Sequence, residues 1–290
     1  MKATPLNAFT IDLEGWYQSL RPDPDPVPLA KQKDGIREGI DRLLALCGRR
    51  RVKATWFTLG AVAELMPAEL RAIADAGHEI ASHGYGHDDV DALGPEGFAA
   101  DLAKSEEILE AASGQKPRGY RSPKWSAGRA GTWYFDALRQ RGYAYDSSLN
   151  PVPMLGARGM RHDVHRVRGV AELPPTAVRT LVGWLPCGGS LGLRNLTHRV
   201  IAKRVAGLNA TGEPAMFWVH PWELAQRRLA GRMPFATRLV CNVARVDLEA
   251  RLERLFGEFP FGTALAALAA REARGPLPEI ENPAFREAAR

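Results

Sequence analysis

Residues 52–87 read VKATWFTLGAVAELMPAELRAIADAGHEIASHGYGH, and this stretch decides the fold. Residues 52–58 form an apolar run that predicts a buried strand. Residues 67–76 begin with a proline and end before Gly77, which is typical of a helix. Residues 78–82 predict a second strand. Because two strands joined by a helix form the unit of a parallel sheet, the stretch indicates an α/β fold.

The same alternation extends over most of the chain. Four prolines between residues 22 and 28 predict a long loop after the first strand. Residues 151–186 show no clear period, and the tail from Gly275 is expected to be loosely ordered. Helices are predicted at residues 34–46, 95–112, 132–140, 246–256 and 262–273, and strands at residues 8–12, 119–121, 143–145 and 215–219.

The composition is that of a globular protein. Hydrophobic residues make up 45% of the 290 residues and charged residues 25%, which is enough to bury a large core. No window of roughly 18 apolar residues exists, so no membrane span is predicted. A solvated surface rich in arginine explains the formal net charge of +6, and the alternative is an anionic partner such as a lipid phosphate, a sugar phosphate or a nucleic acid. Nucleic acid is not expected as a partner, because no basic motif is interleaved with aromatic residues.

Three cysteines, Cys47, Cys187 and Cys241, are widely separated and odd in number. This pattern argues against a disulfide framework and favours a reducing compartment. The first residues contain no apolar segment of signal-peptide length, since the polar Asp12 and Glu14 follow at once. We therefore expect a cytoplasmic protein with at most peripheral membrane contact. The sequence does not predict an oligomeric state.

Chemically active side chains fall where predicted strands end. In barrels and open parallel sheets, the carboxyl ends of the strands assemble the active site. We therefore expect these residues to lie at one edge of the sheet. They are Asp12, His83, Arg121, Asp146 and His220.

Residues 82–87 (SHGYGH) form the clearest local motif. Two histidines four residues apart, His83 and His87, can direct both imidazoles at one ion, as in zinc sites. Neutral imidazole also suits cobalt, nickel or iron. The alternative is a pair of ordinary loop histidines. The preceding strand and the intervening Gly84 and Gly86 favour the metal site, because they allow a tight backbone around an ion.

The sequence Asp12-Leu13-Glu14 supplies two carboxylates at a strand end. Residues two apart point the same way in a strand, so both can face one pocket. One carboxylate can complete a three-ligand metal site that leaves a position for water, and the other can act as general base. The alternative is a solvated strand end.

His220 follows a very apolar strand and is flanked by tryptophans, in the run MFWVHPWE of residues 216–223. Such surroundings tune the pKa of an imidazole, and His220 can protonate a leaving amine. The alternative is a core histidine. Trp125 and Trp222 suit a wall on which a sugar stacks, although tryptophans also pack simply as core.

Two further residues are expected to support the acid and the base. Arg121 is a fixed cation at a strand end that can pair with Asp12 and keep it ionised. Asp146 can do the same for His220. Both pairings are inferred from the shared position at strand ends.

Taken together, these segments resemble the polysaccharide deacetylase family, the chitooligosaccharide deacetylase homology domain of carbohydrate esterase family four. Within it, the chain is most similar to the subgroup found beside exosortase and exopolysaccharide gene clusters. The likeness spans about residues 7–265. It is carried by residues 7–14 (NAFTIDLE), 54–57 (ATWF), 77–83 (GHEIASH), His87, 119–123 (GYRSP), 145–148 (YDSS), 172–174 (ELP), 186–189 (PCGG) and 220–223 (HPWE).

The resemblance implies a distorted (β/α) barrel of about seven parallel strands that forms one catalytic domain at residues 1–274, with a tail at residues 275–290. It implies one divalent metal ion, with zinc expected first and cobalt or nickel as alternatives. By analogy Asp12 is the base and His220 the acid, Arg121 orients Asp12, and Asp146 supports His220. The metal ligands would be Glu14, His83 and His87, and the substrate-binding residues Pro123, Trp125 and Trp222.

One motif departs from the family. Most members have two adjacent aspartates at the first strand, whereas here Leu13 separates Asp12 from Glu14. We expect a metal-dependent hydrolase that removes N-acetyl groups from an acetamido sugar of a polysaccharide or its precursor, free or lipid-linked. The alternatives are a hydrolase of another amide (a formamido sugar, a ureide or a cyclic amide), with or without a metal, and an inactive sugar-binding module.

Overall fold

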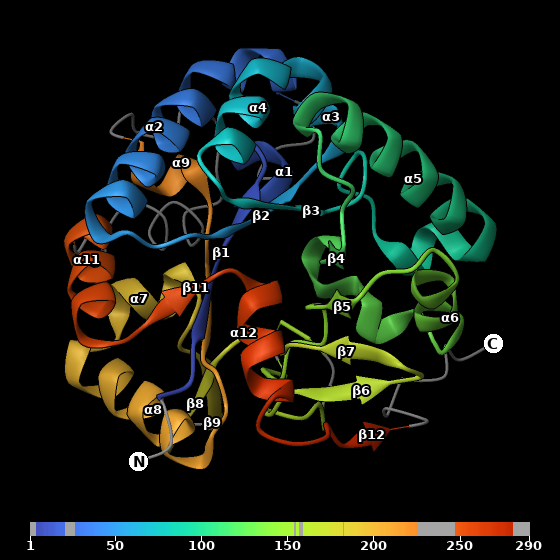
Figure 1. Cartoon of the computed structure of the whole chain (residues 1–290). Coiled ribbons are helices and arrows are strands. Elements are labelled where there is room, and N and C mark those ends of the chain that lie inside the picture. The colour runs from blue at the N-terminus through green and yellow to red at the C-terminus, as the bar shows by residue number, and fades with distance from the viewer. Residues whose placement is uncertain are drawn as a thin grey trace.

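The computed structural model describes residues 4–20, 27–153, 155–156, 159–181, 183–225 and 247–280. A mostly parallel sheet runs through this part of the chain (Figure 1). Its strand order is β10-β1-β2-β3-β4-β5-β7-β6-β12, and β11 pairs with β1. The strands are β1 (Asn7–Leu13), β2 (Thr55–Thr58), β3 (Glu79–Ser82), β4 (Gly119–Tyr120), β5 (Tyr145–Asp146), β6 (His165–Val167), β7 (Val170–Glu172), β10 (Met216–Val219), β11 (Phe261–Gly262) and β12 (Glu279–Ile280).

The strands from β10 to β7 in this order are parallel, and β6 is antiparallel to β7. This gives the seven parallel strands that were expected of a (β/α) barrel. The strands β8 (Ala177–Thr180) and β9 (Gly183–Pro186) form a separate antiparallel hairpin. The prediction of an α/β fold built on a parallel sheet is therefore confirmed.

Helices surround the strands on the outside (Figure 1). Consecutive parallel strands need such crossovers, since a short hairpin turn cannot join them. Among the described residues, no helix is long and apolar enough to span a bilayer. The helices are α1 (Trp16–Leu20), α2 (Lys33–Arg50), α3 (Gly60–Leu65), α4 (Pro67–Asp75), α5 (Val90–Ser113), α6 (Trp133–Gln140), α7 (Ser190–Asn195), α8 (His198–Thr211), α9 (Pro221–Leu224), α11 (Leu248–Glu258) and α12 (Ala264–Glu272), with 3-10 turns η1 (Leu29–Gln32) and η2 (Pro123–Arg129).

Helix α2 shows how the pattern of apolar residues becomes packing. Ile36, Ile40 and Leu43 follow at helical spacing, and all three are buried against the sheet. Gly39 lies on the same helix where α9 crosses it. A Cβ atom at Gly39 would lie 2.1 Å from the carbonyl oxygen of Pro221, so only glycine permits this approach.

The segment that follows β7 contacts β10, the first strand in the sheet order, through a threonine hydroxyl group instead of a regular ladder of backbone hydrogen bonds. After β7 the chain passes through Pro174 and Pro175, which have no backbone N–H to donate. Thr176 follows, and its N–H donates to the carbonyl of Met216 at 3.1 Å. The N–H of Met216 donates to Oγ1 of Thr176 at 2.7 Å. The two prolines thus interrupt the ladder, and Thr176 joins the segment after β7 to β10.

Several regions differ from the sequence-based expectation. The loop expected after residue 12 contains α1, whereas Pro22, Pro24 and Pro26 lie outside the described residues. The unassigned residues 151–186 contain β6 to β9. The tail was expected to be loose, but Glu279–Ile280 pairs with β6 as β12. Strands of two to four residues carry too few side chains to show a period, which is why these elements were missed.

Candidate active site

The predicted strand-end residues gather at one edge of the sheet. Asp12 is the last residue but one of β1, and Arg121 directly follows β4. His83 and His220 directly follow β3 and β10. All four side chains are buried or nearly so, with His220 retaining 15% exposure. The structure therefore brings the expected base, its arginine and two of the expected histidines into one site.

Three side chains form a cluster of the kind that holds a metal ion. One ligand atom each from Glu14, His83 and His87 lies within 4.8 Å of the others, and all three residues are buried. Oε2 of Glu14 is 2.8 Å from Nε2 of His87 and 3.9 Å from Nε2 of His83. Two imidazoles and one carboxylate are a usual donor set for zinc with an open fourth position.

A hydrogen bond fixes the ring of His83. Its Nδ1 lies 2.7 Å from the carbonyl oxygen of Arg121. Since a carbonyl only accepts, Nδ1 carries the proton and Nε2 keeps its lone pair toward the cluster. Burial lowers the pKa of His83, and the nearby carboxylates of Asp12 and Glu14 offset this only in part. The imidazole is thereby held neutral, as a ligand requires.

The carboxylate of Glu14 is ionised within the cluster. Burial alone would raise its pKa, but His87, His220 and His83 lower it from 4.5 to about 2. His87 itself adopts a left-handed backbone with φ of 69°, which is uncommon for a residue other than glycine. Strained backbone of this kind is found where a side chain must be aimed at a functional group.

Arg121 holds Asp12 as the sequence predicted. Nη1 of Arg121 donates to Oδ1 of Asp12 at 2.6 Å and to Oγ1 of Thr10 at 2.9 Å. On its other side, Arg121 donates to the backbone oxygen of Ser147 at 3.2 Å and to its Oγ at 2.9 Å. The guanidinium also lies 4.1 Å from the ring of Phe57. A buried arginine with this many partners fixes the direction of the carboxylate it holds.

Carboxylates surround His220 on both sides. Its Nε2 is 3.3 Å from Oε1 of Glu14 and 3.9 Å from Oδ2 of Asp12. Its Nδ1 is 3.4 Å from Glu223, which also accepts the backbone N–H of His220 at 3.0 Å. Burial would lower the pKa of His220, but these carboxylates, Glu223 first, raise it to about 9. His220 is therefore protonated at neutral pH and has a proton to give.

Asp146 does not lie beside His220. Its Oδ1 accepts hydrogen bonds from Tyr134 at 2.8 Å and from Ser148 at 2.5 Å, on the side of the sheet that faces α6. In the ladder it stands opposite Glu172. Burial raises the pKa of Asp146 to about 6 and that of Glu172 well above its usual value, so the two buried carboxyl groups share a proton. The expected pairing with His220 is replaced by Glu223.

The expected substrate-binding residues lie near the site in different environments. Trp222 is buried, and its ring stacks on His220 with centroids 5.3 Å apart. Trp125 is half-buried and lies 5.2 Å from the guanidinium of Arg121. Pro123 is buried at the start of η2. Lys124 and Trp125 both have positive φ, which turns the backbone sharply at this rim.

Sequence reasoning missed three residues that are partners of the predicted site residues. Glu223 lies three residues after His220 and reaches back to its backbone, an arrangement typical of a helix start. Ser147 was quoted only as part of a motif, and it is the residue that anchors Arg121. Glu172 was likewise quoted without a role. The spacing of His220 and Glu223 was the one local signal available, since the other two contacts join separate strands.

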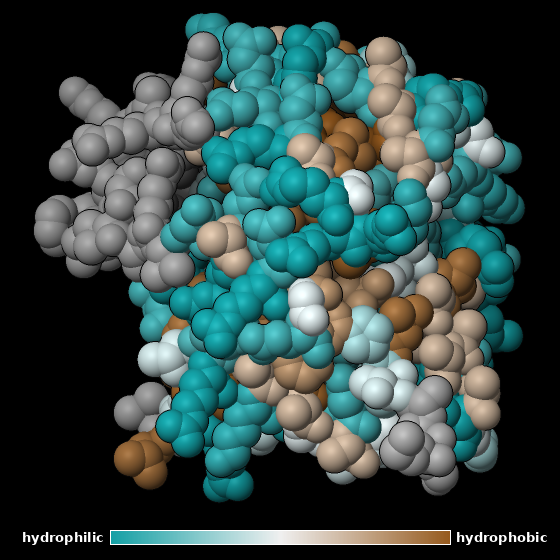
Figure 2. All heavy atoms as spheres, turned by 60° about the vertical axis from the view of Figure 1, so that its left-hand side comes forward, coloured by the Kyte–Doolittle hydropathy of each residue, from teal (hydrophilic) through white to brown (hydrophobic). Residues whose placement is uncertain are grey.

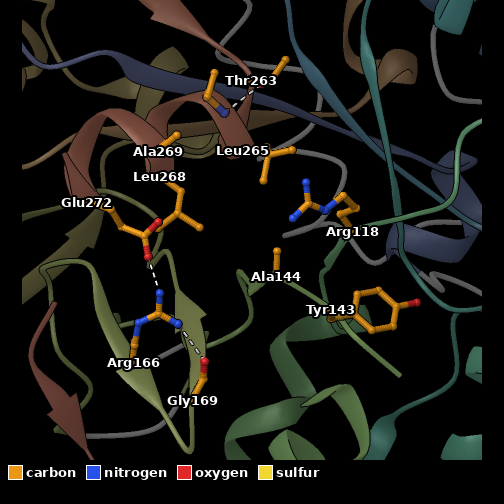
Figure 3. Close-up of a pocket in the computed structure, with 11 residues that line it drawn as sticks. Arg118, Tyr143, Ala144, Arg166, Gly169, Thr263, Leu265, Leu268, Ala269 and Glu272 are labelled. Carbon is orange, nitrogen blue, oxygen red and sulfur yellow. Dashed lines mark hydrogen bonds and ion pairs between the residues drawn. The ribbon is translucent and has the colours of Figure 1, made fainter. Parts of the chain in front are cut away.

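A recess at the opposite end of the sheet contains none of these residues. It is a cavity of about 670 Å³ beside α12, lined by Arg118 and Ala144, which precede β4 and β5, and by Arg166 (Figure 3). The guanidinium of Arg166 is already held by Glu272 and by the carbonyl of Gly169. The candidate catalytic and metal-binding residues therefore lie at the carboxyl edge of the sheet, away from this cavity.

Two models of protein families match parts of the chain. Residues 32–145 match the family model for polysaccharide deacetylase, and residues 147–269 match the model of a domain of unknown function, DUF3473. Each match covers less than half of the chain, so the first part is similar to polysaccharide deacetylases and the second part to DUF3473. Glu14 and Asp12 lie before the first match, and His220 lies in the second.

A curated relative matches part of the chain, and two solved structures share its fold. The chain is 31% identical over 147 residues to a peptidoglycan deacetylase of Helicobacter pylori, which covers 50% of this chain and 49% of that protein. The chain thus spans about half of that relative's length. The structure of a putative polysaccharide deacetylase from Mycobacterium smegmatis matches 98% of this chain and 99% of its own, with a TM-score of 0.62 and 21% identity. A probable polysaccharide deacetylase from Pseudomonas aeruginosa matches 94% of this chain and 92% of its own, with a TM-score of 0.60 and 18% identity.

Proposed function

We propose that the chain is a metal-dependent hydrolase that removes the N-acetyl group from an acetamido sugar of a polysaccharide or its precursor. One observation carries this proposal. A cluster of Glu14, His83 and His87 lies beside a carboxylate held by an arginine and beside a protonated histidine. Hydrolysis of an amide needs these three functions, which are an electrophile, a base and an acid. The match to the polysaccharide deacetylase family supports the same reaction.

The residues present fit a divalent ion. The tautomer of His83 leaves Nε2 free to bind, and the carboxylate of Glu14 is ionised. The donors are buried and converge from the residue that follows β1 and from the loop that follows β3. A bound ion would polarise the amide carbonyl and make a water molecule more acidic. Zinc is the expected ion because of the two imidazoles, with cobalt or nickel as alternatives.

The remaining steps belong to Asp12 and His220. Arg121 holds Oδ1 of Asp12, which leaves Oδ2 to accept a proton from the attacking water. Oδ2 lies 3.9 Å from Nε2 of His220, so acid and base face the same space. His220 then donates its Nε2 proton to the nitrogen of the leaving sugar amine. Glu223 stabilises the protonated imidazole before this transfer.

The substrate side of the proposal rests on aromatic side chains. Trp125 lies at the rim of the site and retains partial exposure. Aromatic faces of this kind stack on sugar rings. Trp222 is buried beneath His220, so we assign it to holding the imidazole as well as to shaping the pocket.

The first experiment measures metal content and acetate release together. The purified chain, reconstituted with zinc, is incubated with N-acetylglucosamine oligomers, and the matched substrates carry formyl groups in place of acetyl. We expect acetate release that falls roughly 100-fold or more in Asp12→Asn and in His220→Gln. We expect His83→Ala to lose the metal, with Glu14→Ala testing the third ligand separately.

Each other outcome selects an alternative. Hydrolysis of the formyl but not the acetyl substrate would select another amide. Hydrolysis without any bound metal would contradict the metal-dependent mechanism. Binding of the oligomers without release of acetate, in a chain that holds metal, would select the inactive sugar-binding module. Retention of metal by Glu14→Ala would contradict only the assignment of Glu14.

Three further predictions concern the subgroup, the form of the substrate and the cellular compartment. We also propose that the chain belongs to the exosortase-associated subgroup, on the resemblance of its sequence motifs. A lipid-linked precursor is one form that the substrate can take. Cys47 and Cys187 are free and buried, and burial raises the pKa of both thiols to about 12, which suits a reducing compartment such as the cytoplasm. Cell fractionation would test the location.

A further inference from the structure

A long stretch of the chain lacks acidic residues altogether. The sequence contains 33 aspartate and glutamate residues, yet none lies between Glu172 and Glu213. This stretch forms the β8–β9 hairpin, α7 and α8. Its cations therefore have no acidic neighbour along the chain. They are Arg179, Arg194, Arg199, Lys203 and Arg204.

Exposed apolar side chains gather in the same stretch. Leu181 at the tip of the hairpin is fully exposed, at 108%, and Leu191 and Val200 are 38% and 37% exposed. These three are the exposed large hydrophobic side chains of the described residues. The side chain of Leu181 is therefore accessible to a partner outside the chain.

The hairpin and α8 form one continuous surface. Nε of Arg204 donates to the carbonyl of Ala177 at 2.7 Å, and its guanidinium lies 6.0 Å from the ring of Trp184. Val200 precedes Lys203 by three residues and Arg204 by four, so it neighbours both cations on the surface of α8. The face of α8 that meets the hairpin thus also carries an exposed cation and an exposed valine.

This surface is firmly attached to the rest of the fold. At the base of the hairpin, Thr176 is hydrogen-bonded to Met216 and Gly188 accepts the N–H of Trp218 at 2.8 Å. Both partners belong to β10. Figure 1 places α8 and the hairpin in the lower part of the molecule, and Figure 2 shows hydrophilic and apolar side chains mixed over the lower part of the face that it displays.

We propose that this surface binds an anionic phospholipid bilayer. We call it the hairpin surface, and it consists of Arg179, Leu181, Trp184, Val200, Lys203 and Arg204. An apolar tip enters the boundary between headgroups and acyl chains, while cations around it meet the lipid phosphates. A half-buried tryptophan beside them suits the same interface. A nucleic acid would use the cations but offers nothing to a leucine that projects from the surface, so the bilayer is favoured.

The test is sedimentation with vesicles of phosphatidylcholine, alone or with roughly one-third phosphatidylserine, at about 0.1 M salt. We expect the parent chain to bind only the anionic vesicles. Lys203→Gln should lower the partition coefficient about fivefold, because one cation near an anionic surface is lost. Leu181→Ser should lower it about tenfold. Lys116→Gln is the matched control, an exposed lysine that follows α5 and lies outside the hairpin surface.

Three results would overturn the proposal. The first is a parent chain that binds anionic and neutral vesicles equally or not at all. The second is an equal loss of binding in Lys116→Gln and Lys203→Gln. The third is tighter binding to duplex DNA than to the anionic vesicles, which would select a nucleic acid. Acetate release from a soluble oligomer should be unchanged in Leu181→Ser and Lys203→Gln, so failure here is distinguishable from failure of the proposed hydrolase.

Discussion

The carboxyl pair of Asp146 and Glu172 gives a prediction that depends only on the fold. Both groups are fully buried, and they stand opposite each other on β5 and β7. Burial raises the pKa of Asp146 from 3.8 to about 6 and raises that of Glu172 further above its usual value. In the unfolded chain both carboxyls lose their protons near pH 4. The folded chain therefore holds more protons between pH 4 and pH 6.

The sign follows from this difference in bound protons. Because the folded state binds more protons than the unfolded state, the free energy of unfolding falls as the pH rises. The stabilising contribution is present below about pH 4 and is lost as the pH rises through the folded pKa values. A shift from 3.8 to about 6 corresponds to about 3 kcal/mol for Asp146. Replacing Glu172 with glutamine removes the second charge and supplies an amide that can donate to Asp146.

Urea unfolding of the parent chain and of Glu172→Gln, from pH 4 to pH 9, measures the effect. We expect similar stability at pH 4 and an advantage for Glu172→Gln that grows as the pH rises toward 9, because only the parent chain must then ionise a second buried carboxyl group. Other groups titrate equally in both proteins and cancel in the difference. Glu110→Gln is the control, since that carboxylate is exposed on α5 and removing it leaves the buried pair intact. A difference that stays constant from pH 4 to pH 9 would refute the shared proton.

Three further predictions concern packing and capping. Gly39→Ala should destabilise the chain by about 1–3 kcal/mol because its Cβ would meet the carbonyl of Pro221, whereas Gly48→Ala on the same helix meets open space and should stabilise by about 0.5–1 kcal/mol; equal effects of the two would contradict the close approach. Leu43→Ala should cost about 2–5 kcal/mol in thermal or urea unfolding, because the side chain is fully buried, and a cost below 1 kcal/mol would contradict that burial. Asp247→Ala should cost about 0.5–2 kcal/mol, because Asp247 accepts the N–H of Ala250 at the start of α11, and Asp247→Asn should restore most of that loss.

The parallel core could be predicted because its elements are long or strongly patterned. The apolar spacing of Ile36, Ile40 and Leu43 predicts α2, and residues 52–58 contain β2. The strands around residues 165–186 could not be predicted, because they are short and are fixed by pairing with distant segments. The pairing of β12 with β6 depends on tertiary contact in the same way.

The strand-end positions of Asp12, His83 and His220 could be predicted, because parallel strands present their carboxyl ends together. Glu223, the partner of His220, could not be predicted in this way. Asp146 ends β5, but its side chain faces α6, since neighbouring residues of a strand point to opposite faces of the sheet. Ser147, the next residue, faces inward and holds Arg121. The residue that serves the site is therefore Ser147, one position after the predicted Asp146, whose side chain lies on the other face of the sheet.

Residues 7–13 lie beside residues 216–219, so the first and one of the last strands of the sheet are neighbours. The separation along the chain is about 200 residues, and closing so long a loop makes this contact slow to form. Asp12 and Glu14 come from the first strand, and His220 follows the later one. The first half of the chain supplies Asp12, Glu14, His83 and His87, but not His220. The candidate site is therefore complete only when β10 pairs with β1, so the proposed hydrolysis would require both parts of the chain.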